Sequence, residues 1–384
     1  MQSIANIYII LSFFIYIILF VVIYMIILDI IHVISSKRVK KLDNTFKKEV
    51  LRQLNYIKED KEILKLHIEY VAQSLKKRHY LQSFINAITE FNKNEENHKF
   101  TRIYISNYEI FVENFLKKNK KKDETIKVYC AVILGEFKLS NYEINSFLME
   151  SLNTNSLYLR VASLEAISKI GNLNKFIEAI KYISDNNYYI NNKIFIDILK
   201  EFGGDKYLLN KELIDNFNIF NNDLKKSIVD HFKNNKVEFV KEKLLEILKD
   251  ENSEKEIRIS AIKYFSIINS KYAQEIIIDI LKRGEWEYRA VSAATLSSYK
   301  NEESINSLLE SITDKNWYVR YNSAISLLHI NEDIINLVFL KGDKYSRDII
   351  FYAMFMEDRI SYEEYLEKSI YLDKIKYLEV INNV

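Results

Sequence analysis

The sequence predicts an all-α protein in which one N-terminal transmembrane helix is followed by an α-solenoid of helical hairpins. Three observations lead to this prediction. Residues 7–28 are apolar except for Ser12, and seven later segments align at steps of 31 to 33 residues. The 384-residue chain also contains no proline and only six glycines. Average usage would place about nineteen prolines in such a chain, so few helix breakers interrupt it.

The apolar run is long enough to cross a bilayer. Its 22 residues span about 33 Å as a helix, and a hydrocarbon core is about 30 Å thick. No Lys or Arg precedes the run, and no small-x-small cleavage site comes after it. Since a cleaved signal peptide carries both features, we expect residues 1–36 to form a retained membrane anchor.

Basic residues come directly after the apolar run. By the positive-inside tendency, they predict a single-pass protein of the cell membrane with its N-terminus outside and its repeat region in the cytoplasm. A second role for this cluster is contact with anionic lipid headgroups, which would make the protein a membrane-surface sensor. The cluster comprises Lys37, Arg38, Lys40, Lys41, Lys47 and Lys48.

Residues 37–99 are predicted to form a juxtamembrane stalk and a helical N-terminal cap. An apolar stripe at three- and four-residue steps indicates a helix that leaves the membrane and docks on the next helices of the chain. The polar stretch from Asn92 to Lys99 is the expected boundary before a repeat array at 100–384. A last irregular unit after Arg347 is expected to cap this array. The stripe comprises Leu42, Phe46, Val50, Leu54 and Ile57.

Each repeat is predicted to be a helical hairpin. The residues four and seven positions after each of seven anchor residues are apolar in every case. Because these two offsets lie on one helical face, they predict the buried stripe of the second helix of each hairpin. Such a hairpin covers its apolar face only by packing against its neighbours. The anchors are Lys127, Arg160, Asn192, Lys225, Arg258, Arg289 and Arg320.

The segment from Asp314 to Arg320, together with Ser323-Ala324 and Leu327-Leu328 after it, resembles the HEAT repeat family, including the HEAT-like repeats of phycobilin lyases. The resemblance implies a HEAT-like superhelix in a membrane-anchored bacterial protein. In that family an Asp and an Arg tie successive turns together, a role implied here for Asp314 and for Arg160, Arg258, Arg289 and Arg320. Only Asp314 lies six residues before its Arg. The other three arginines have Thr154, Asn252 and Arg283 at that offset.

Composition and motifs do not predict catalysis. A formal net charge of +2 does not suggest a nucleic-acid partner, and the single cysteine, Cys130, excludes an intrachain disulfide. The six histidines form no metal-ligand pair, and the chain has no His-Glu dipeptide. The HEAT-like enzyme deoxyhypusine hydroxylase holds its di-iron centre with such dipeptides. No phosphate-binding loop, nucleophile elbow or Cys-x-x-Cys motif occurs, and Gly203-Gly204 is interpreted as a helix C-terminal cap.

We therefore expect no catalytic residue, metal, cofactor or small-molecule substrate. The predicted function is a membrane-anchored protein-binding scaffold or adaptor whose partner is a membrane-embedded or membrane-recruited protein. The alternatives are the membrane-surface sensor and a HEAT-like enzyme of lyase or hydroxylase type, or an accessory subunit of one. The lysine-rich run from Lys117 to Lys122 is interpreted as a solvated loop, with contact to anionic lipid or an acidic partner as its alternative.

Two tryptophans are the candidate partner-binding residues. Trp286 and Trp317 both lie three residues before an anchor arginine, and Tyr288 and Tyr318 accompany them. Consecutive repeats should place the two indoles at the same point of the inter-helix turn, about 10 Å apart. There they would form a binding hot spot. The alternative is that each ring packs over the neighbouring unit and stiffens the stack.

Overall fold

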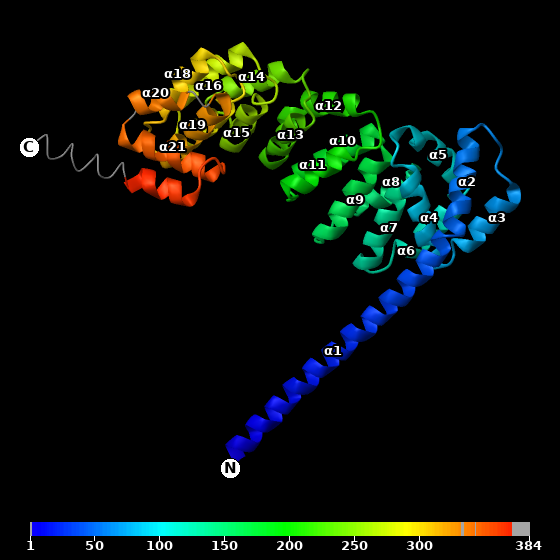
Figure 1. Cartoon of the computed structure of the whole chain (residues 1–384). Helices are drawn as coiled ribbons and strands as arrows, with labels where there is room; N and C mark the ends of the chain where they lie inside the picture. The colour runs from blue at the N-terminus through cyan, green and yellow to red at the C-terminus, as the bar shows by residue number, and fades with distance from the viewer. Residues whose placement is uncertain (1, 332–333, 342, 371–384) are drawn as a thin grey trace, which may run out of the picture. The chain divides into compact units, whose positions relative to one another are not determined.

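The computed structural model describes residues 2–331, 334–341 and 343–370, and all regular structure within these ranges is helical (Figure 1). The predicted all-α class is confirmed. The chain divides into two compact units. The first unit also includes one short segment from within the sequence range of the second. Unit 1 comprises Met1–Ala179 with Glu201–Asp205, and unit 2 comprises Ile180–Lys200 with Lys206–Val384.

Unit 1 begins with the long helix α1, and its later helices form hairpins in which α6 packs on α7, α8 on α9, and α7 on α9. Helix α10 (Leu173–Asp185) runs from unit 1 into unit 2. The helices of unit 1 are α1 (Gln2–Asp43), α2 (Phe46–Lys58), α3 (Lys65–Ser74), α4 (Arg78–Phe91), the 3₁₀ turn η1 (Glu95–Asn97), α5 (His98–Ser106), α6 (Glu109–Asn119), α7 (Glu124–Phe137), α8 (Tyr142–Glu150) and α9 (Leu157–Ile170).

Unit 2 is a two-layered array of hairpins. The second helices α11, α13, α15, α17, α19 and α21 pack side by side in one layer, and α14, α16 and α18 form the other (Figure 1). The helices are α11 (Asn192–Lys200), α12 (Lys206–Asp215), the 3₁₀ turn η2 (Phe217–Ile219), α13 (Asn222–Asn234), α14 (Lys241–Lys249), α15 (Lys255–Tyr264), α16 (Lys271–Arg283), α17 (Trp286–Leu296), α18 (Glu302–Ser311), α19 (Trp317–Ile330), α20 (Ile334–Lys341) and α21 (Lys344–Met356). Residues 362–370 are also helical.

Burial confirms the register of the repeats. The residue seven positions after each anchor is buried in all seven repeats, and the residue four positions after is buried in six, with Ile196 half-buried. Polar side chains start many of the helices. Asp123, Ser156 and Asn221, for example, accept the backbone N–H three residues later, which satisfies one of the free donors of a helix N-terminus. Because the chain contains no proline, such caps mark where the helices of the hairpins begin.

Helix α1 has two parts with different surroundings. Its large apolar side chains between Leu11 and Ile34 are exposed, whereas its last residue, Asp43, is bound to α4. The Asp43 carboxylate accepts hydrogen bonds from Ser83 Oγ at 2.6 Å and from Asn86 Nδ2 at 3.1 Å. The long helix is therefore continuous from its apolar segment to its attachment on α4.

The apolar stripe of the expected stalk lies mostly on the packed helix α2. Phe46, Val50, Leu54 and Ile57 are buried, and their helix α2 lies against α4 and α5. These four residues thus dock on the helices that follow them, and α2 is a helix of unit 1. The polar stretch 92–99 also lies inside unit 1, between α4 and α5, so it does not separate the two compact units. Part of the expected C-terminal cap, residues 371–384, lies outside the described residues.

The prediction that Gly203-Gly204 forms a helix C-terminal cap was wrong. Among the described glycines only Gly171 has a positive φ, 78°, and it caps α9 in the left-handed conformation. Gly203 instead lies against the end of that helix, where its N–H donates to the Ser168 carbonyl at 2.9 Å. A Cβ atom on Gly203 would overlap with the carbonyl oxygen of Lys169. Gly203 is therefore needed for a close backbone approach.

Candidate partner-binding surface

Aromatic side chains form a continuous row on the second-helix layer of unit 2. The row starts at the first residue of α17, continues along α19 and α21, and ends in the helical residues 362–370. We call these eight side chains the aromatic ladder. It consists of Trp286, Trp317, Tyr318, Tyr321, Tyr352, Phe355, Tyr362 and Tyr365.

The two tryptophans each stack on a tyrosine. The rings of Trp286 and Tyr318 are nearly parallel, with centroids 5.6 Å apart and an interplanar angle of 26°. Trp317 stacks on Tyr321 at 5.0 Å and 8°, and its edge meets Tyr318 at 5.3 Å. Tyr318 therefore joins the two tryptophans, which come from consecutive repeats. Each such contact adds about 1 kcal/mol beyond the burial of area.

The ladder continues into the last described helices. Tyr352 lies 5.8 Å from Trp317 and 6.1 Å from Tyr365. Tyr365 then stacks on Phe355 at 5.5 Å, and Phe355 contacts Tyr362 at 5.8 Å. Ring contacts thus connect four helices without a break.

Of the four candidate partner-binding side chains, three are exposed and Tyr288 is buried. Trp286 is 42% exposed, Trp317 41% and Tyr318 57%, so each ring packs on one side and remains open to solvent on the other. Tyr288 is only 9% exposed and lies beneath the Arg258 guanidinium, 5.2 Å from its ring centroid. It therefore lies outside the exposed aromatic surface that the sequence predicted for it.

Sequence reasoning missed five members of the ladder. Tyr321 lies one helical turn after Trp317, so their shared face was a usable signal. Tyr352 and Phe355 belong to the irregular last unit, whose step from the preceding anchor does not match the others, so the repeat alignment could not relate them to Trp317. The same holds for Tyr362 and Tyr365, which lie beyond the last anchor.

One carboxylate joins two consecutive repeats beside this surface. Asp314 accepts two hydrogen bonds from Arg289, from Nε at 2.8 Å and from Nη2 at 3.0 Å. Its backbone carbonyl accepts a third, from Arg320 Nη1 at 2.8 Å. Arg289 also donates to the Gly284 carbonyl at 2.8 Å. Asp314 thus binds the arginine of the preceding repeat with its side chain and that of its own repeat with its backbone.

Replacing Asp314 with Ala is expected to destabilise unit 2 by about 2 kcal/mol at neutral pH, because it leaves a largely buried guanidinium without its carboxylate. Burial alone would raise the pKa of Asp314, but hydrogen bonds from Arg289 and from the Asn316 backbone outweigh it and hold the pKa below its ordinary value. The stabilisation is therefore present above about pH 4 and is lost as the pH falls further. Denaturant unfolding at pH 7 and pH 3 measures both effects.

The control for this prediction is Glu310→Ala, which removes an exposed ion pair with Lys282. Surface pairs contribute about 0–1 kcal/mol, so this variant should unfold almost like the native protein. Equal losses in the two variants would contradict a special role for Asp314.

The other two arginines of the implied Asp–Arg ladder bind backbone carbonyls of their own hairpins. Arg160 donates to the carbonyls of Leu152 and Thr154, and Arg258 Nε donates to that of Leu248 at 3.1 Å. Arg258 still connects two repeats, because its guanidinium lies over Tyr288 of the next one. The structure thus places all four arginines beside inter-helix turns, and at Asp314 a carboxylate links two successive repeats through Arg289.

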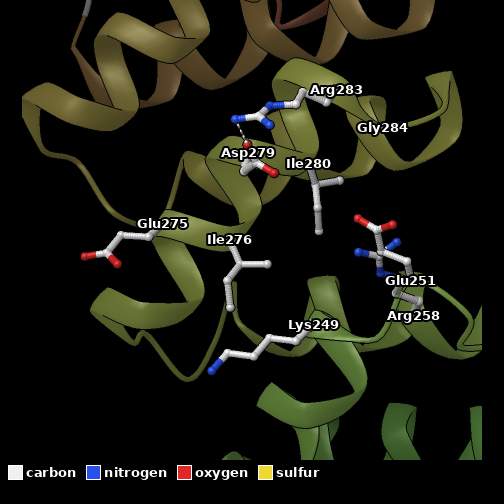
Figure 2. A pocket seen from close by; sticks show the side chains of 9 residues that line it. All are labelled: Lys249, Glu251, Arg258, Glu275, Ile276, Asp279, Ile280, Arg283 and Gly284. Carbon is white, nitrogen blue, oxygen red and sulfur yellow. Dashed lines mark ion pairs between the residues drawn. The ribbon is translucent and has the colours of Figure 1, made fainter.

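A cleft of about 460 Å³ opens beside Arg258 (Figure 2). Its walls come from the end of α14, the start of α15 and one face of α16. Arg283 and Asp279 form an exposed ion pair of 2.9 Å at this site. The cleft is lined by Lys249, Glu251, Arg258, Glu275, Ile276, Asp279, Ile280, Arg283 and Gly284.

The basic cluster lies at the end of α1 and the start of α2. Lys37, Arg38, Lys40 and Lys41 are exposed on α1, and Lys48 is exposed on α2. Lys47 is half-buried and pairs with Glu90 at 2.7 Å. Within the described residues, α1 is the one helix long and apolar enough to cross a membrane, judged by length and composition.

In the parts of the chain that the structure describes, no group of three or more His, Cys, Asp or Glu side chains is placed to hold a metal ion. Cys130 is buried, and burial raises the pKa of its thiol to about 12. At neutral pH this cysteine is a protonated core residue.

The match to one sequence family supports the fold. A family model described as HEAT repeats matches residues 240–331, and this match confirms the resemblance. The matched residues contain the hairpins α14/α15, α16/α17 and α18/α19. Human deoxyhypusine hydroxylase in complex with glycerol is 13% identical, with a TM-score of 0.27, over 77% of this chain and 97% of that chain. An engineered protein is 12% identical, with a TM-score of 0.32, over 88% and 98%. No curated protein matches the sequence significantly.

Proposed function

We propose that this chain, whose residues 240–331 are HEAT repeats, is a non-catalytic scaffold or adaptor that is anchored in the cell membrane by α1 and binds another protein through the aromatic ladder. The repeat region lies in the cytoplasm in this proposal. The partner is a membrane-embedded or membrane-recruited protein, because the anchor confines the binding surface to the bilayer.

The observation that carries the proposal is the aromatic ladder. Single exposed apolar side chains are ordinary on protein surfaces, but this row joins eight aromatic rings over four helices. Trp and Tyr dominate the hot spots of protein interfaces because they offer large, rigid contact areas. The pre-stacked rings lose little conformational entropy when a partner binds. A solenoid presents such a row as an extended surface suited to a protein.

The anchor is supported by the exposed apolar part of α1. Its side chains from Leu11 to Ile34 have no cover from the rest of unit 1, and exposed apolar surface of this extent is unfavourable in water. A bilayer would cover it. The exposed lysines and arginine that come after it favour a cytoplasmic location for everything beyond α1.

A second candidate function is binding to the membrane surface itself. Helix α3 and its N-cap expose the apolar side chains of Leu64, Leu66 and Tyr70. Tyr70 lies 6.0 Å from Phe46, the first residue of α2, close to the end of α1. These residues and the basic cluster favour contact with anionic headgroups. The enzyme alternative rests on the fold alone, and a stoichiometric transition metal in the purified full chain would favour it.

The proposal is tested by photo-crosslinking in intact cells with the native chain and with the double variant Trp286→Ala, Trp317→Ala. We expect a membrane protein to crosslink to the native chain, with a loss of at least tenfold in the double variant, because interface hot spots contribute about 2 kcal/mol or more each. Mass spectrometry identifies and quantifies the crosslinked protein.

Tyr272→Ala is the matched control, since Tyr272 is an exposed aromatic residue of α16 outside the ladder. It should crosslink like the native chain, and circular dichroism should show that the double variant is folded. Equal crosslinking in all three chains would exclude the ladder as the binding surface. Crosslinks to lipid alone would favour the membrane-surface candidate.

A further inference from the structure

The Asp–Arg ladder of unit 2 has a gap one repeat before Asp314. Asp314 lies 25 residues after Arg289, to which it is bound. The equivalent position after Arg258 is occupied by Arg283, which has the opposite charge. The repeat therefore keeps the guanidinium but replaces the carboxylate that would bind it.

Arg258 is fixed in position and has more N–H donors than its hydrogen bond to Leu248 uses. Its side chain is 8% exposed, its Nε donates to the Leu248 carbonyl, and its guanidinium rests on the Tyr288 ring. Burial raises the pKa of Tyr288, and Arg258 acts in the opposite direction. An arginine carries five N–H donors, and among the described residues no carboxylate lies within ion-pair distance of this one. A largely buried cation in this state favours an anionic ligand.

The cleft beside Arg258 gives an anion access to this guanidinium. Its other charged side chains are Lys249 and Arg283 on the positive side and Glu251, Glu275 and Asp279 on the negative side. Asp279 is already paired with Arg283, while Glu251 and Glu275 are not buried. Figure 2 shows Glu251 and Arg258 at the same end of the cleft, yet the structure gives no ion pair between these two described residues. Glu251 is thus an internal competitor for an incoming anion.

We propose that Arg258 and this cleft form a carboxylate-binding site that takes an Asp or Glu side chain of the protein partner, in the place that Asp314 occupies one repeat later. This inference rests on the proposed function. Gly284 lines the cleft, and Trp286, the first residue of α17, comes two positions later. One partner segment with an acidic and an apolar residue can therefore contact the cleft and the aromatic ladder together.

A carboxylate fits this site better than a phosphate. The next repeat shows that the same arginine position binds a planar, singly charged carboxylate through two parallel hydrogen bonds, which is the preferred geometry of this pair. Three acidic side chains also line the cleft, and they would repel a dianion more strongly than a monoanion.

The first experiment titrates the full chain in nanodiscs with N-acetyl-aspartate amide and, in parallel, with N-acetyl-asparagine amide at constant ionic strength. The chain has two tryptophans, both in the aromatic ladder, so intrinsic fluorescence excited at the indole band reports on this region alone. We expect a saturable fluorescence change with the aspartate probe, and an affinity at least about tenfold higher than for the asparagine probe. In Arg258→Gln the affinity for the aspartate probe should fall by a similar factor. Equal responses to the two probes would overturn the proposal.

A second experiment does not depend on how well Arg258→Gln folds. In an Asp279→Asn background, Arg283→Asp restores a carboxylate at the ladder position, and Arg283→Asn is the uncharged control of the same size. We expect the aspartate variant to have the higher midpoint of thermal unfolding and no response to the aspartate probe. A midpoint no higher than that of the control would contradict the proposal. Since the probes are not the partner, these results are separate from the crosslinking test of the proposed function.

Discussion

Replacement of Gly203 by Ala is expected to destabilise unit 1 by about 3 kcal/mol or more, the largest effect of any single methyl group that we predict. The added Cβ atom would overlap with the backbone carbonyl oxygen of Lys169 in the last turn of α9. A backbone atom cannot rotate away as a side chain can, so the two chain segments must separate. That separation also breaks the hydrogen bond from Gly203 N–H to Ser168.

The measurement is urea unfolding of the full chain, monitored by circular dichroism. Glu201→Ala is the control, because Glu201 is an exposed residue of the same turn and its change should stay within about 0.5 kcal/mol. If Gly203→Ala unfolds at the same urea concentration as this control, the close approach of the two segments is not required for stability.

Lowering the pH from 6.5 to 4 is expected to destabilise unit 2 by about 3 kcal/mol through His231 alone. Burial lowers the pKa of this imidazole from 6.5 to about 4. Its Nε2 donates to Asn210 Oδ1 at 3.0 Å, and its Nδ1 accepts from Asn235 Nδ2 at 3.1 Å. A second proton on Nδ1 would remove the acceptor on which the Asn235 bond depends, so the folded state favours the neutral ring.

Proton binding sets the sign of this effect. Below pH 6.5 the unfolded chain binds a proton at His231 while the folded chain does not, so falling pH favours unfolding until about pH 4 is reached. His231→Gln should remove most of this slope from urea unfolding curves recorded at several pH values. His67, whose pKa burial also lowers, accounts for a remaining slope in unit 1. An unchanged slope in His231→Gln would show that the histidine is not neutral and buried in the native protein.

Sequence periodicity was sufficient for the fold because every repeat buries the same helical face. From Leu134 to Leu327, one apolar residue per repeat lies in the core, and this spacing survives even where Asn192 replaces the basic anchor. The close approach of Gly203 could not be predicted, because it depends on where one helix ends relative to the next. Glycine in a sequence does not distinguish a left-handed cap from a steric contact.

The candidate site was only partly predictable for a related reason. Trp286 and Tyr288 are two residues apart on one helix, so they face different directions, and which of them is exposed depends on how α17 rests on its neighbours. The family resemblance implied that Asp314 connects turns, but the structure was needed to show that its carboxylate binds Arg289 of the preceding repeat. The sequence already showed that Arg283 replaces the acidic residue of the family pattern. That this replacement leaves Arg258 without a carboxylate partner among the described residues could be inferred only once the structure showed that Arg258 is buried.

The continuity of α1 bears on how such a protein finds its partner. A domain on a flexible linker searches a volume set by linker length, but here the helix runs without a break from its apolar segment to Asp43, which is bound to α4. With α1 in the bilayer, as proposed, the residues from Ser35 to Asp43 hold the attachment point about 14 Å beyond the apolar segment. Unit 1 is then carried at a nearly constant height, and its search for a partner becomes two-dimensional.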